Sequence, residues 1–541
     1  MVQIVVLSWM VALASVVSAG PTSTQANDES IEATNGRQAN EALNRSRRFV
    51  LGWLRHADLK TGLIPRNLEA DKDIWNAKDS AADNYPFMVL TCALTDEDMF
   101  RGRMLEMLRT ETKLCSRVDR LPDTWNFVKQ GFDTEKIDLD AVIFGSAEYC
   151  KDGLMPLTEW LGPSPWSERL IGILDDLWKH APVETPFGKI PSTNSEVNGG
   201  LLQVLCRVFW MTGDRKYLDW AERLGDYYLL GEHHPTRDEA TIKLRDHGSE
   251  IVGGLSELYL TTHYADREKK NAYREPLHEM LDRILEVGRN EHGLFYNQVD
   301  LNTGKPLLIS PGTAMVCDTW GYVCNAYYTV YLVDKTRRYH EAVLVALGNL
   351  NTHYKGYDWE RGSADGIADS VEGAINLLNR ELDDSAPAWI EHEIDKMFAI
   401  QKEDGVIEGW HGDGNFARTA AMYALWKSQG ATVRPWREDV CLGAVRTGRT
   451  LSLSLSAARP WKGRIVFDRP RHREYLRLPV DYPRINQFPE WYTVGGDTVY
   501  EIQTPTDGQT LKGRQLWEGL PVELTKGRPA LRITVQSKSS R

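Results

Sequence analysis

The sequence has few cysteines and, after its first residues, no long hydrophobic run. Its 541 residues include 7 cysteines. This small, odd number argues against a disulfide framework, and no CxxC pair indicates a metal site. Cys317 and Cys324 fall on one face of an expected helix, but too far apart along its axis to bond each other. We therefore expect buried, unpaired thiols, and the lack of later hydrophobic runs excludes a further membrane-spanning helix.

Blocks of basic residues and the common nucleotide, hydrolase and metal motifs are also absent. The 64 Lys and Arg residues are outnumbered by 76 Asp and Glu, a formal net charge of -12, which argues against a nucleic-acid partner and an anionic membrane. The chain contains no Walker A motif, no GxGxxG after an expected strand, no GxSxG, and no HExxH or EF-hand spacing. His233 and His234 are adjacent and project in different directions, so we expect no metal.

Large aromatic side chains, by contrast, are abundant. The chain has 18 Trp, 21 Tyr and 13 Phe, and 42% of its residues are hydrophobic. This content supports a large core in two or more domains. It suits a packed helical protein or a cleft that binds sugars.

The N-terminus has the features of a targeting signal. Residues 4–17 are nearly all apolar, and the small residues at 17–19 suit cleavage by a signal peptidase. We predict a signal peptide over residues 1–19, removed from a secreted or periplasmic protein. Residues 20–38 are rich in Ser, Thr, Asn and Asp and are predicted to form a flexible leader.

Residues 39–434 show one amphipathic helix after another. Leu201, Leu205 and Val208 belong to one apolar stripe, and Ile251 and Leu255 begin a similar one. More polar helices alternate with these, and the pairs recur about every 40 to 60 residues. We predict a mainly α fold in which roughly six or seven helical hairpins close into an (α/α) toroid, with an open solenoid as the alternative.

After residue 434 the pattern alternates with a period of two. Residues 451–456 alternate Leu and Ser, and residues 464–468, 499–503 and 531–535 are similar, with Pro and Gly between them. We predict a small, sandwich-like β domain over residues 435–541. It is expected to pack against the toroid and to carry no catalytic residue.

Polar residues cluster directly before the apolar helices. Six such segments lie at residues 83–85, 194–198, 245–247, 318–320, 365–369 and 411–415. If the inner helices of a toroid run parallel, their N-terminal ends share one rim and these residues ring a single cleft. The positive ends of the helix dipoles would favour an anionic ligand there. Taken singly, each residue is equally well explained as a helix cap or a core polar group.

Several polar residues are predicted to face this cleft. His247 and Asn198 each lie four residues before members of an apolar stripe, so both follow a buried helix face. A buried imidazole and amide can polarise a carboxylate, although a core histidine is the alternative. Tyr296 lies in a loop, where a phenol beside a sugar can transfer a proton. Arg245 and Arg289 are the nearest candidates to neutralise an anion.

The signal peptide, the helical hairpins and the C-terminal β domain together resemble secreted carbohydrate-active enzymes of the (α/α) toroid class. Within this class, polysaccharide lyase family 38, which acts on alginate and glucuronan, has an Asn, Glu, His, Arg, Tyr order that is similar to Asn198, Glu239, His247, Arg289 and Tyr296. Alternatives for Glu239 and Arg289 that fit nearly as well are Asp238, Arg245 and His292.

The resemblance implies β-elimination at a 4-linked uronate of an anionic polysaccharide or oligosaccharide, without a metal or organic cofactor. Asn198 and His247, with an Arg or a protonated Glu239, would neutralise the carboxylate and stabilise the enolate-like dianion. Tyr296 would remove the C5 proton and protonate the leaving oxygen, with His247 as the alternative base. The other predicted substrate-binding residues are Asn194, Arg245, Arg289, Trp320 and His411, and Trp320 and Trp410 would stack on sugar faces.

A glycoside hydrolase on the same scaffold is the main alternative, because it needs two carboxylates across the scissile bond. The carboxylates available near the rim are Asp83, Glu250, Asp318, Asp365, Asp369, Glu372 and Asp413. Unsaturated glucuronyl hydrolases resemble this architecture as well. A third hypothesis is a non-catalytic glycan-binding protein. The sequence names neither the sugar nor the oligomeric state.

Overall fold

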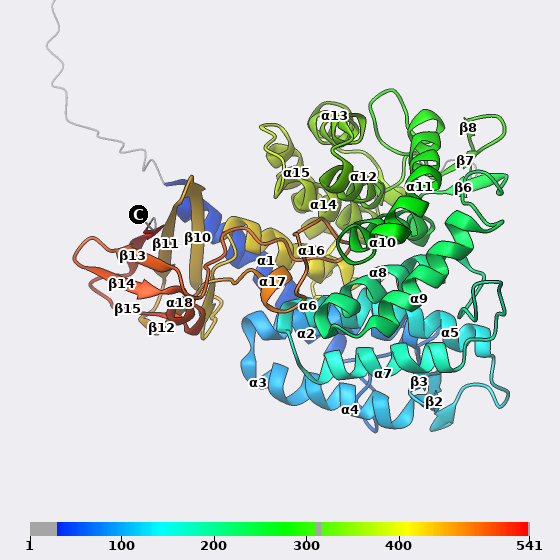
Figure 1. The fold of residues 1–541 in the computed structure, drawn as a ribbon. Helices are drawn as coiled ribbons and strands as arrows, with labels where there is room; N and C mark the ends of the chain where they lie inside the picture. The colour runs from blue at the N-terminus through cyan, green and yellow to red at the C-terminus, as the bar shows by residue number, and fades with distance from the viewer. Residues whose placement is uncertain (1–29, 309–314, 539–541) are drawn as a thin grey trace, which may run out of the picture.

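The computed structural model describes residues 30–308 and 315–538 of the chain, and its helices form an (α/α) toroid with a β domain beside it (Figure 1). The predicted signal peptide, residues 1–19, lies outside the described residues. Within them, seven outer and seven inner helices alternate along the chain, and most inner helices pack on the outer helix that follows them, while the last inner helix packs on the first outer helix. Because outer and inner helices alternate, the inner helices run in one direction. The predicted toroid is confirmed.

The outer helices are α1 (Ile31–Leu54), α4 (Leu105–Leu114), α7 (Pro165–Lys179), α9 (Arg215–Gly225), α11 (Arg267–Val287), α13 (Arg337–His353) and α15 (Ala386–Ile400). The inner helices are α2 (Tyr85–Thr95), α6 (Met155–Leu161), α8 (Ser195–Thr212), α10 (Glu250–Ala265), α12 (Trp320–Asp334), α14 (Ala364–Leu378) and α16 (Asn415–Lys427). Neighbouring inner helices contact one another around the ring, and α16 returns to α2, so the ring is closed.

A π-helix directly precedes two of the inner helices, α2 and α6. Segment η1 (Ala77–Asn84) continues into α2, and α5 (Leu139–Glu148) passes through the π-helix η3 (Tyr149–Leu154) into α6. The remaining short helices are α3 (Glu97–Met99), η2 (Phe100–Met104), η4 (Asp226–Leu230), η5 (Asp246–Ser249), η6 (Trp359–Gly362), α17 (Arg471–Glu474) and α18 (Gly513–Glu518). Short π-helical insertions are rare and often lie at functional sites.

Glycines allow the inner helices to approach closely. A Cβ atom on Gly321 of α12 would lie 2.3 Å from the Cα of Gly373 on α14. On the opposite pair, a Cβ on Gly254 of α10 would lie 2.5 Å from the carbonyl oxygen of Gly199 on α8. Real Cβ atoms are not found at such distances from backbone, so these contacts require glycine.

The C-terminal domain consists of two antiparallel sheets around a core of its own. One sheet has the order β10-β11-β16-β13-β14 and the other β15-β12-β9. The strands are β9 (Thr432–Arg434), β10 (Val440–Thr447), β11 (Thr450–Ala457), β12 (Trp461–Val466), β13 (Val499–Gln503), β14 (Gly508–Lys512), β15 (Leu520–Leu524) and β16 (Ala530–Ser537). The leucines of β11 are buried and its serines are half-buried, as the alternation predicts.

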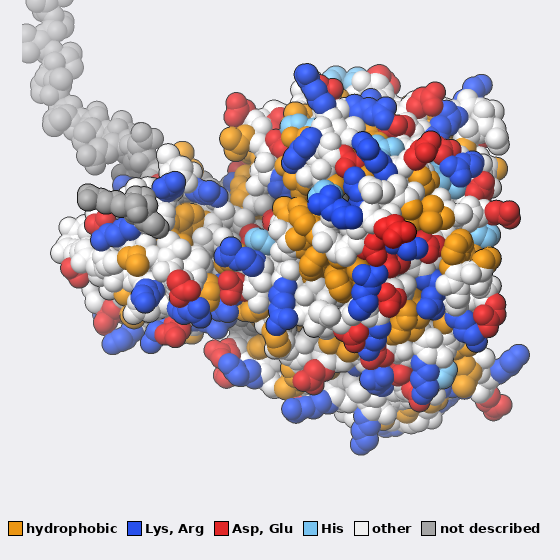
Figure 2. All heavy atoms as spheres, viewed as in Figure 1, with side chains coloured by type: hydrophobic (Ala, Val, Ile, Leu, Met, Phe, Trp, Pro, Cys, Tyr) orange, Lys and Arg blue, Asp and Glu red, His pale blue; other side chains and the backbone are white. Residues whose placement is uncertain are grey.

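Small sheets lie in the loops of the toroid. Their strands are β1 (Ile74–Trp75), β4 (Trp125–Asn126) and β5 (Gly131–Phe132) in one sheet, β2 (Ser116–Val118) and β3 (Leu121–Pro122) in a second, and β6 (Thr241–Lys243), β7 (Gln298–Asp300) and β8 (Lys305–Pro306) in a third. Acidic and basic side chains are interspersed over the face in Figure 2. No described helix is both long enough and apolar enough to cross a bilayer.

The two predicted domains are more tightly joined than the sequence indicates. Helix α1 begins at Ile31, inside the predicted leader of residues 20–38, because Ser30 caps it and its polar face binds β10. The side-chain amide of Asn35 donates to the carbonyl of Ala444 at 3.0 Å, and that of Asn40 donates to the carbonyl of Val440 at 2.9 Å. Polar composition alone does not distinguish such a helix face from a leader.

A second connection is residues 470–491, which we call the return segment. It leaves the β domain after β12 and enters the toroid, where Leu476, Tyr482 and Phe488 join the helical core. The predicted domain boundary at residue 435 is close to the start of β9. The return segment, however, passes from the β domain back into the toroid. The seven cysteines are all described and unpaired; six are buried and Cys441 is half-buried.

We predict that Gly321→Ala lowers the free energy of unfolding by about 1–3 kcal/mol, because its Cβ would meet the backbone of α14. Chemical denaturation monitored by circular dichroism measures the change. Gly102→Ala in η2 is the matched control: a Cβ there meets nothing within 4 Å, so its stability should be unchanged or slightly raised. Equal effects of the two substitutions would contradict the packing argument.

Candidate active site

A cavity of about 60 Å³ lies at the end of the toroid where the inner helices begin. Its lining residues are Asp83, Lys151, Asp152, Asp246, His247, Glu250, Thr319, Tyr322, Asp365, Asp369, His411, Asn415 and Arg418. Five of the six polar segments singled out in the sequence contribute to it, and residues 194–198 do not. The side chain of His247 is 38% exposed, so the cavity is open to solvent on that side.

The two π-helices deliver one carboxylate each to this cavity, Asp83 from η1 and Asp152 from η3. Their close approach depends on Gly153, since a Cβ there would lie 2.8 Å from the carbonyl oxygen of Ala81. The wider π-turns and this glycine therefore bring two acidic side chains, distant in the sequence, into one small space.

Asp83 is paired with a histidine. The Nε2 atom of His411 lies 3.6 Å from an oxygen of Asp83 and 4.0 Å from one of Asp79. Burial raises the pKa of Asp83 to about 7, with Asp152 adding to the rise and the charge of His411 opposing it. Burial lowers the pKa of His411, but the two carboxylates outweigh it and raise that pKa to about 9. At neutral pH His411 is therefore a cation, and Asp83 is able to gain or lose its proton near neutral pH.

Asp152 lies in a denser set of charges. Its Oδ1 accepts from the ammonium of Lys151 at 2.6 Å, and Lys151 also binds Glu250. The Nδ1 atom of His247 lies 3.3 Å from Glu148, 3.4 Å from Glu250 and 4.0 Å from Asp152. These contacts place two cationic side chains, those of Lys151 and His247, beside the buried Asp152.

The charges around Asp152 separate its pKa from that of its neighbour Glu148. Burial alone would raise the pKa of Asp152, but Lys151, His247 and a hydrogen bond from Glu148 lower it below its usual value. Burial raises the pKa of Glu148 far above its usual value, with Asp152 and Glu250 adding to the rise. Burial lowers the pKa of His247, yet Glu148, Glu250 and Asp152 raise it overall. Asp152 is thus ionised, Glu148 protonated and His247 cationic.

The opposite wall of the cavity is built around Arg418 of α16. Its Nη2 donates to Asp369 at 2.7 Å and lies 3.1 Å from Glu372. The single phenol proton of Tyr322 is shared between Glu372 and Asp369, whose oxygens lie 2.8 Å and 3.0 Å from the phenol oxygen. Burial raises the pKa of Asp369 to about 8 although Arg418 opposes the rise. Tyr322 and Arg418 contact the same oxygen of Asp369, so this wall holds the carboxyl group of Asp369 in one position.

Every cation in the cavity lining is already paired with a carboxylate. The lining has four cationic side chains: Lys151 pairs with Asp152 and Glu250, His247 with Glu250 and Asp152, His411 with Asp83 and Asp79, and Arg418 with Asp369 and Glu372. The cavity therefore offers no unpaired positive charge to a substrate carboxylate.

The residues predicted to catalyse β-elimination do not meet in this cavity. His247 lines it, but Asn198 is fully buried in α8, where its amide donates to the carbonyl of Ser192 at 2.8 Å and to the phenol of Tyr228 at 3.1 Å. Tyr296 is half-buried and bridges to Val316 outside the cavity lining.

Of the predicted substrate-binding residues, His411 lines the cavity. Asn194 caps α8 by accepting from the N–H of Glu196, and Glu239 is exposed. Arg289 donates to the carbonyl of Leu285 at 3.2 Å.

Two further predicted binding residues lie close to the cavity but do not line it. Arg245 lies beside Asp246 at the rim, with 3.2 Å between Nε and Oδ2. Trp320 is fully buried and its indole N–H donates to Ser370 at 2.7 Å. It has no exposed face for a sugar.

The sequence pattern did not indicate Asp152, Lys151, Tyr322 or Arg418 as site residues. One signal was present: Lys151 and Asp152 are adjacent charges that lie, with Glu148, in the mostly apolar stretch Ala147 to Leu157. Charged residues in such a stretch are almost always paired or functional. Tyr322 and Arg418 lie within buried helices, where spacing gives no indication of what they contact.

Three groups of side chains place ligand-type atoms within 4.8 Å of one another: Asp79, Asp83 and His411; Glu148, Asp152 and His247; and Asp246, Asp318 and Glu360. Protonated histidines and Lys151 already neutralise the first two groups. Nothing further in the described part of the chain points to an ion at the third, and we assign no metal.

No family model matches the chain, and no curated protein matches it. Similar solved structures include a glycoside hydrolase family 76 mannosidase from Bacteroides thetaiotaomicron, with 12% identity, a TM-score of 0.39, and 71% of this chain and 99% of that chain covered. A cellobiose 2-epimerase from Spirochaeta thermophila has 16% identity and a TM-score of 0.33, with 53% and 79% covered. A possible glycoside hydrolase family 105 member from Salmonella enterica has 12% identity and a TM-score of 0.37, with 52% and 81% covered.

The positions of the predicted catalytic residues correct the prediction of a polysaccharide lyase. The similar structures are described as hydrolases or as an epimerase rather than as lyases of family 38. The geometry gives the physical reason, since the predicted base Tyr296 and the predicted carboxylate ligand Asn198 lie apart from the cavity that holds His247.

We predict that Lys151→Met destabilises the protein by about 3–5 kcal/mol, because it leaves Asp152 and Glu250 as uncompensated buried charges. Urea unfolding at neutral pH measures the loss. Lys189 pairs with Glu184 at 3.1 Å on the surface, so Lys189→Met is the control and should cost about 0–1 kcal/mol. A loss at Lys151 no larger than that of the control would show that the buried charges are not held by this lysine.

Proposed function

We propose that this chain is a glycoside hydrolase of the (α/α) toroid class that acts on a neutral glycan, with Asp83 as the general acid and Asp152 as the general base. The observation that supports it is a pair of carboxylates in one cavity whose pKa values are pushed apart, that of Asp83 to about 7 and that of Asp152 below its usual value. Such a pair supplies one protonated and one ionised carboxyl group at the same pH.

The two carboxyl groups take different parts in the proposed reaction. Asp83 donates its proton to the glycosidic oxygen as the bond from that oxygen to the anomeric carbon breaks. Asp152 takes a proton from the water that attacks the anomeric carbon, and its negative charge stabilises the positive charge that develops on the sugar ring. Solvent then returns the proton from Asp152 to Asp83, so the net reaction is hydrolysis.

The size and charge of the cavity limit the substrate. A volume of about 60 Å³ is well below the roughly 300–1,000 Å³ of pockets that enclose a whole ligand. We infer that the cavity receives the reacting edge of a sugar and a water, while the rest of the glycan lies at the rim. Trp410, next to His411, is 78% exposed there and offers an aromatic face. The absence of an unpaired cation in the lining favours a neutral sugar over the uronate predicted from the sequence.

Hydrolysis is tested with a panel of neutral and uronate-containing oligosaccharides, scored by new reducing ends. We expect cleavage of a neutral glycan, and a fall in kcat of about 10²- to 10⁴-fold in Asp83→Asn and in Asp152→Asn. Asp497, an exposed residue of the β domain that pairs with Arg514, provides the control Asp497→Asn. Full activity in either cavity variant, or cleavage of uronates alone, would refute the assignment. Binding without cleavage would identify a glycan-binding protein.

The pH dependence follows from the two pKa shifts. The acid Asp83 must be protonated, so kcat/KM should fall as the pH rises above about 7. The base Asp152 must be ionised, so kcat/KM should decline on the acid side only at a pH below 3.8, the ordinary pKa of an aspartate. Among the groups that face Asp83, which also include Asp79, Asp152 and His247, His411 is the main one that lowers its pKa. His411→Gln should therefore move the alkaline decline to higher pH, and a shift to lower pH would contradict this role.

A further inference from the structure

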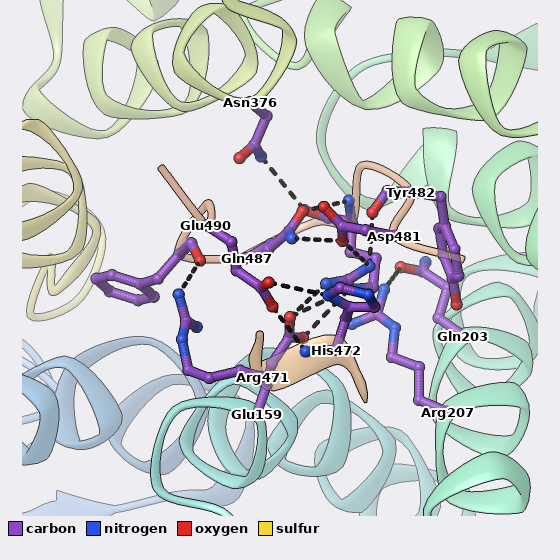
Figure 3. A network of polar contacts seen from close by, with 12 residues as sticks. Glu159, Gln203, Arg207, Asn376, Arg471, His472, Asp481, Tyr482, Gln487 and Glu490 are labelled. Carbon is purple, nitrogen blue, oxygen red and sulfur yellow. Dashed lines mark hydrogen bonds and ion pairs between the residues drawn. The ribbon is translucent and has the colours of Figure 1, made fainter. Parts of the chain in front are cut away.

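The return segment packs into the helical core of the toroid, and buried polar contacts hold it there (Figure 3). Arg484 is fully buried, and its Nη2 donates to Glu159 of α6 at 2.6 Å. The phenol of Tyr482 donates to Glu257 of α10 at 2.9 Å. The amide of Asn376 on α14 donates to the carbonyl of Arg484 at 3.3 Å. Three inner helices thus fix the path of the segment.

This path places Asn486 directly beneath the cavity. Its side-chain Nδ2 donates to Oδ1 of Asp152 at 2.7 Å, and its Oδ1 accepts from Nη1 of Arg418 at 2.7 Å. Its backbone N–H donates to Glu372 at 2.5 Å. Asn486 is 3% exposed. One residue therefore connects the two opposite walls of the cavity.

We propose that Asn486 is a positioning residue that fixes Asp152 and Arg418 relative to each other, and that the C-terminal domain is through it part of the catalytic unit. The inference rests on the proposed function in one respect, the role of Asp152 as base. It goes beyond that function because the sequence pattern assigns the β domain no part in the site.

The chemistry at this position matches an amide. A carboxylate on one side requires a hydrogen-bond donor, and a guanidinium on the other requires an acceptor; a single side-chain amide supplies both. The backbone of Asn486 has φ of 59°, in the left-handed region that asparagine enters more easily than most residues. Aspartate has the same shape but would turn an acceptor toward Asp152.

The charge state of Asp152 reports whether this contact acts as proposed. The other groups that face Asp152 are Lys151, Glu148, His247 and Asp83. They come from the helix of Asp152 itself, η5 and η1, and they remain when Asn486 is changed. Loss of the amide donor should raise the pKa of Asp152, and a second carboxylate in its place should raise it further.

The experiment compares Asn486→Ala, Asn486→Asp and, as the control, Tyr482→Phe, which removes a hydrogen bond of the same segment without touching a cavity residue. Thermal unfolding first establishes that each variant is folded, and the isosteric Asn486→Asp serves if Asn486→Ala is not. The titration of Asp152 is followed by NMR of isotope-labelled aspartate carboxyls, with the signal identified by its loss in Asp152→Asn. The pH profile of hydrolysis is measured in parallel.

We expect the Asn486 variants to raise the pKa of Asp152, move the acid limb of kcat upward by the same amount, and lower kcat about tenfold or more with KM little changed. Tyr482→Phe should leave the titration and kcat as in the unmodified protein. An unshifted titration in Asn486→Asp, or an equal shift in Tyr482→Phe, would overturn the inference. If the unmodified protein hydrolyses no glycan, the proposed function fails, and the claim about Asn486 then stands or falls on the titration alone.

Discussion

The structure depends on pairing the charges that it buries at the centre of the toroid. An isolated charge in a protein interior costs several kcal/mol or more, and a buried pair is tolerated when its geometry and hydrogen bonds are good. Lys151, Arg418 and Arg484 are each almost completely buried, and each contacts at least two carboxylates. The relative positions of the inner helices are therefore fixed by these pairs as well as by apolar packing.

The same pairing sets up the chemistry of the cavity. The side chains of Asp83 and Asp152 are 14% and 6% exposed, but Asp152 has an ammonium group against one oxygen, while the nearest positive charge to Asp83 is an imidazolium at 3.6 Å. The stronger pairing keeps Asp152 ionised, and the weaker pairing lets burial raise the pKa of Asp83. The distance and the type of the charged partner thus separate the pKa values of two chemically identical groups. Enzymes usually assign acid and base roles to carboxyl groups in this way.

Periodicity in the sequence predicted the fold, because helix faces that pack in a ring repeat at regular spacing. It also predicted that polar residues gather at one end of the toroid. The cavity lining includes Asp83, His247, Asp369 and His411, which lie before or near the start of inner helices that run in one direction. The spacing could not show which of these polar groups face the cavity. Asn198 obeys the same pattern as His247, yet its side-chain N–H groups donate to Ser192 in the preceding loop and to Tyr228.

Other parts of the site had no periodic signal. Asp152 reaches the cavity because η3 is a π-helix and Gly153 permits contact with η1, and both features depend on how two helices meet in space.

The return segment shows why a boundary drawn from sequence pattern differs from a boundary in the folded chain. Apart from the one turn of α17, its residues are neither helical nor alternating in pattern, since they contact several different helices, among them α6, α10 and α14. Phe488 and Leu476 join the helical core, and Arg484 and Asn486 satisfy carboxylates that the helices bury. The ring without this segment would leave Glu159 and one side of Asp152 without their partners. The β domain therefore anchors a segment that the toroid needs, and the two predicted domains are interdependent in packing and in charge.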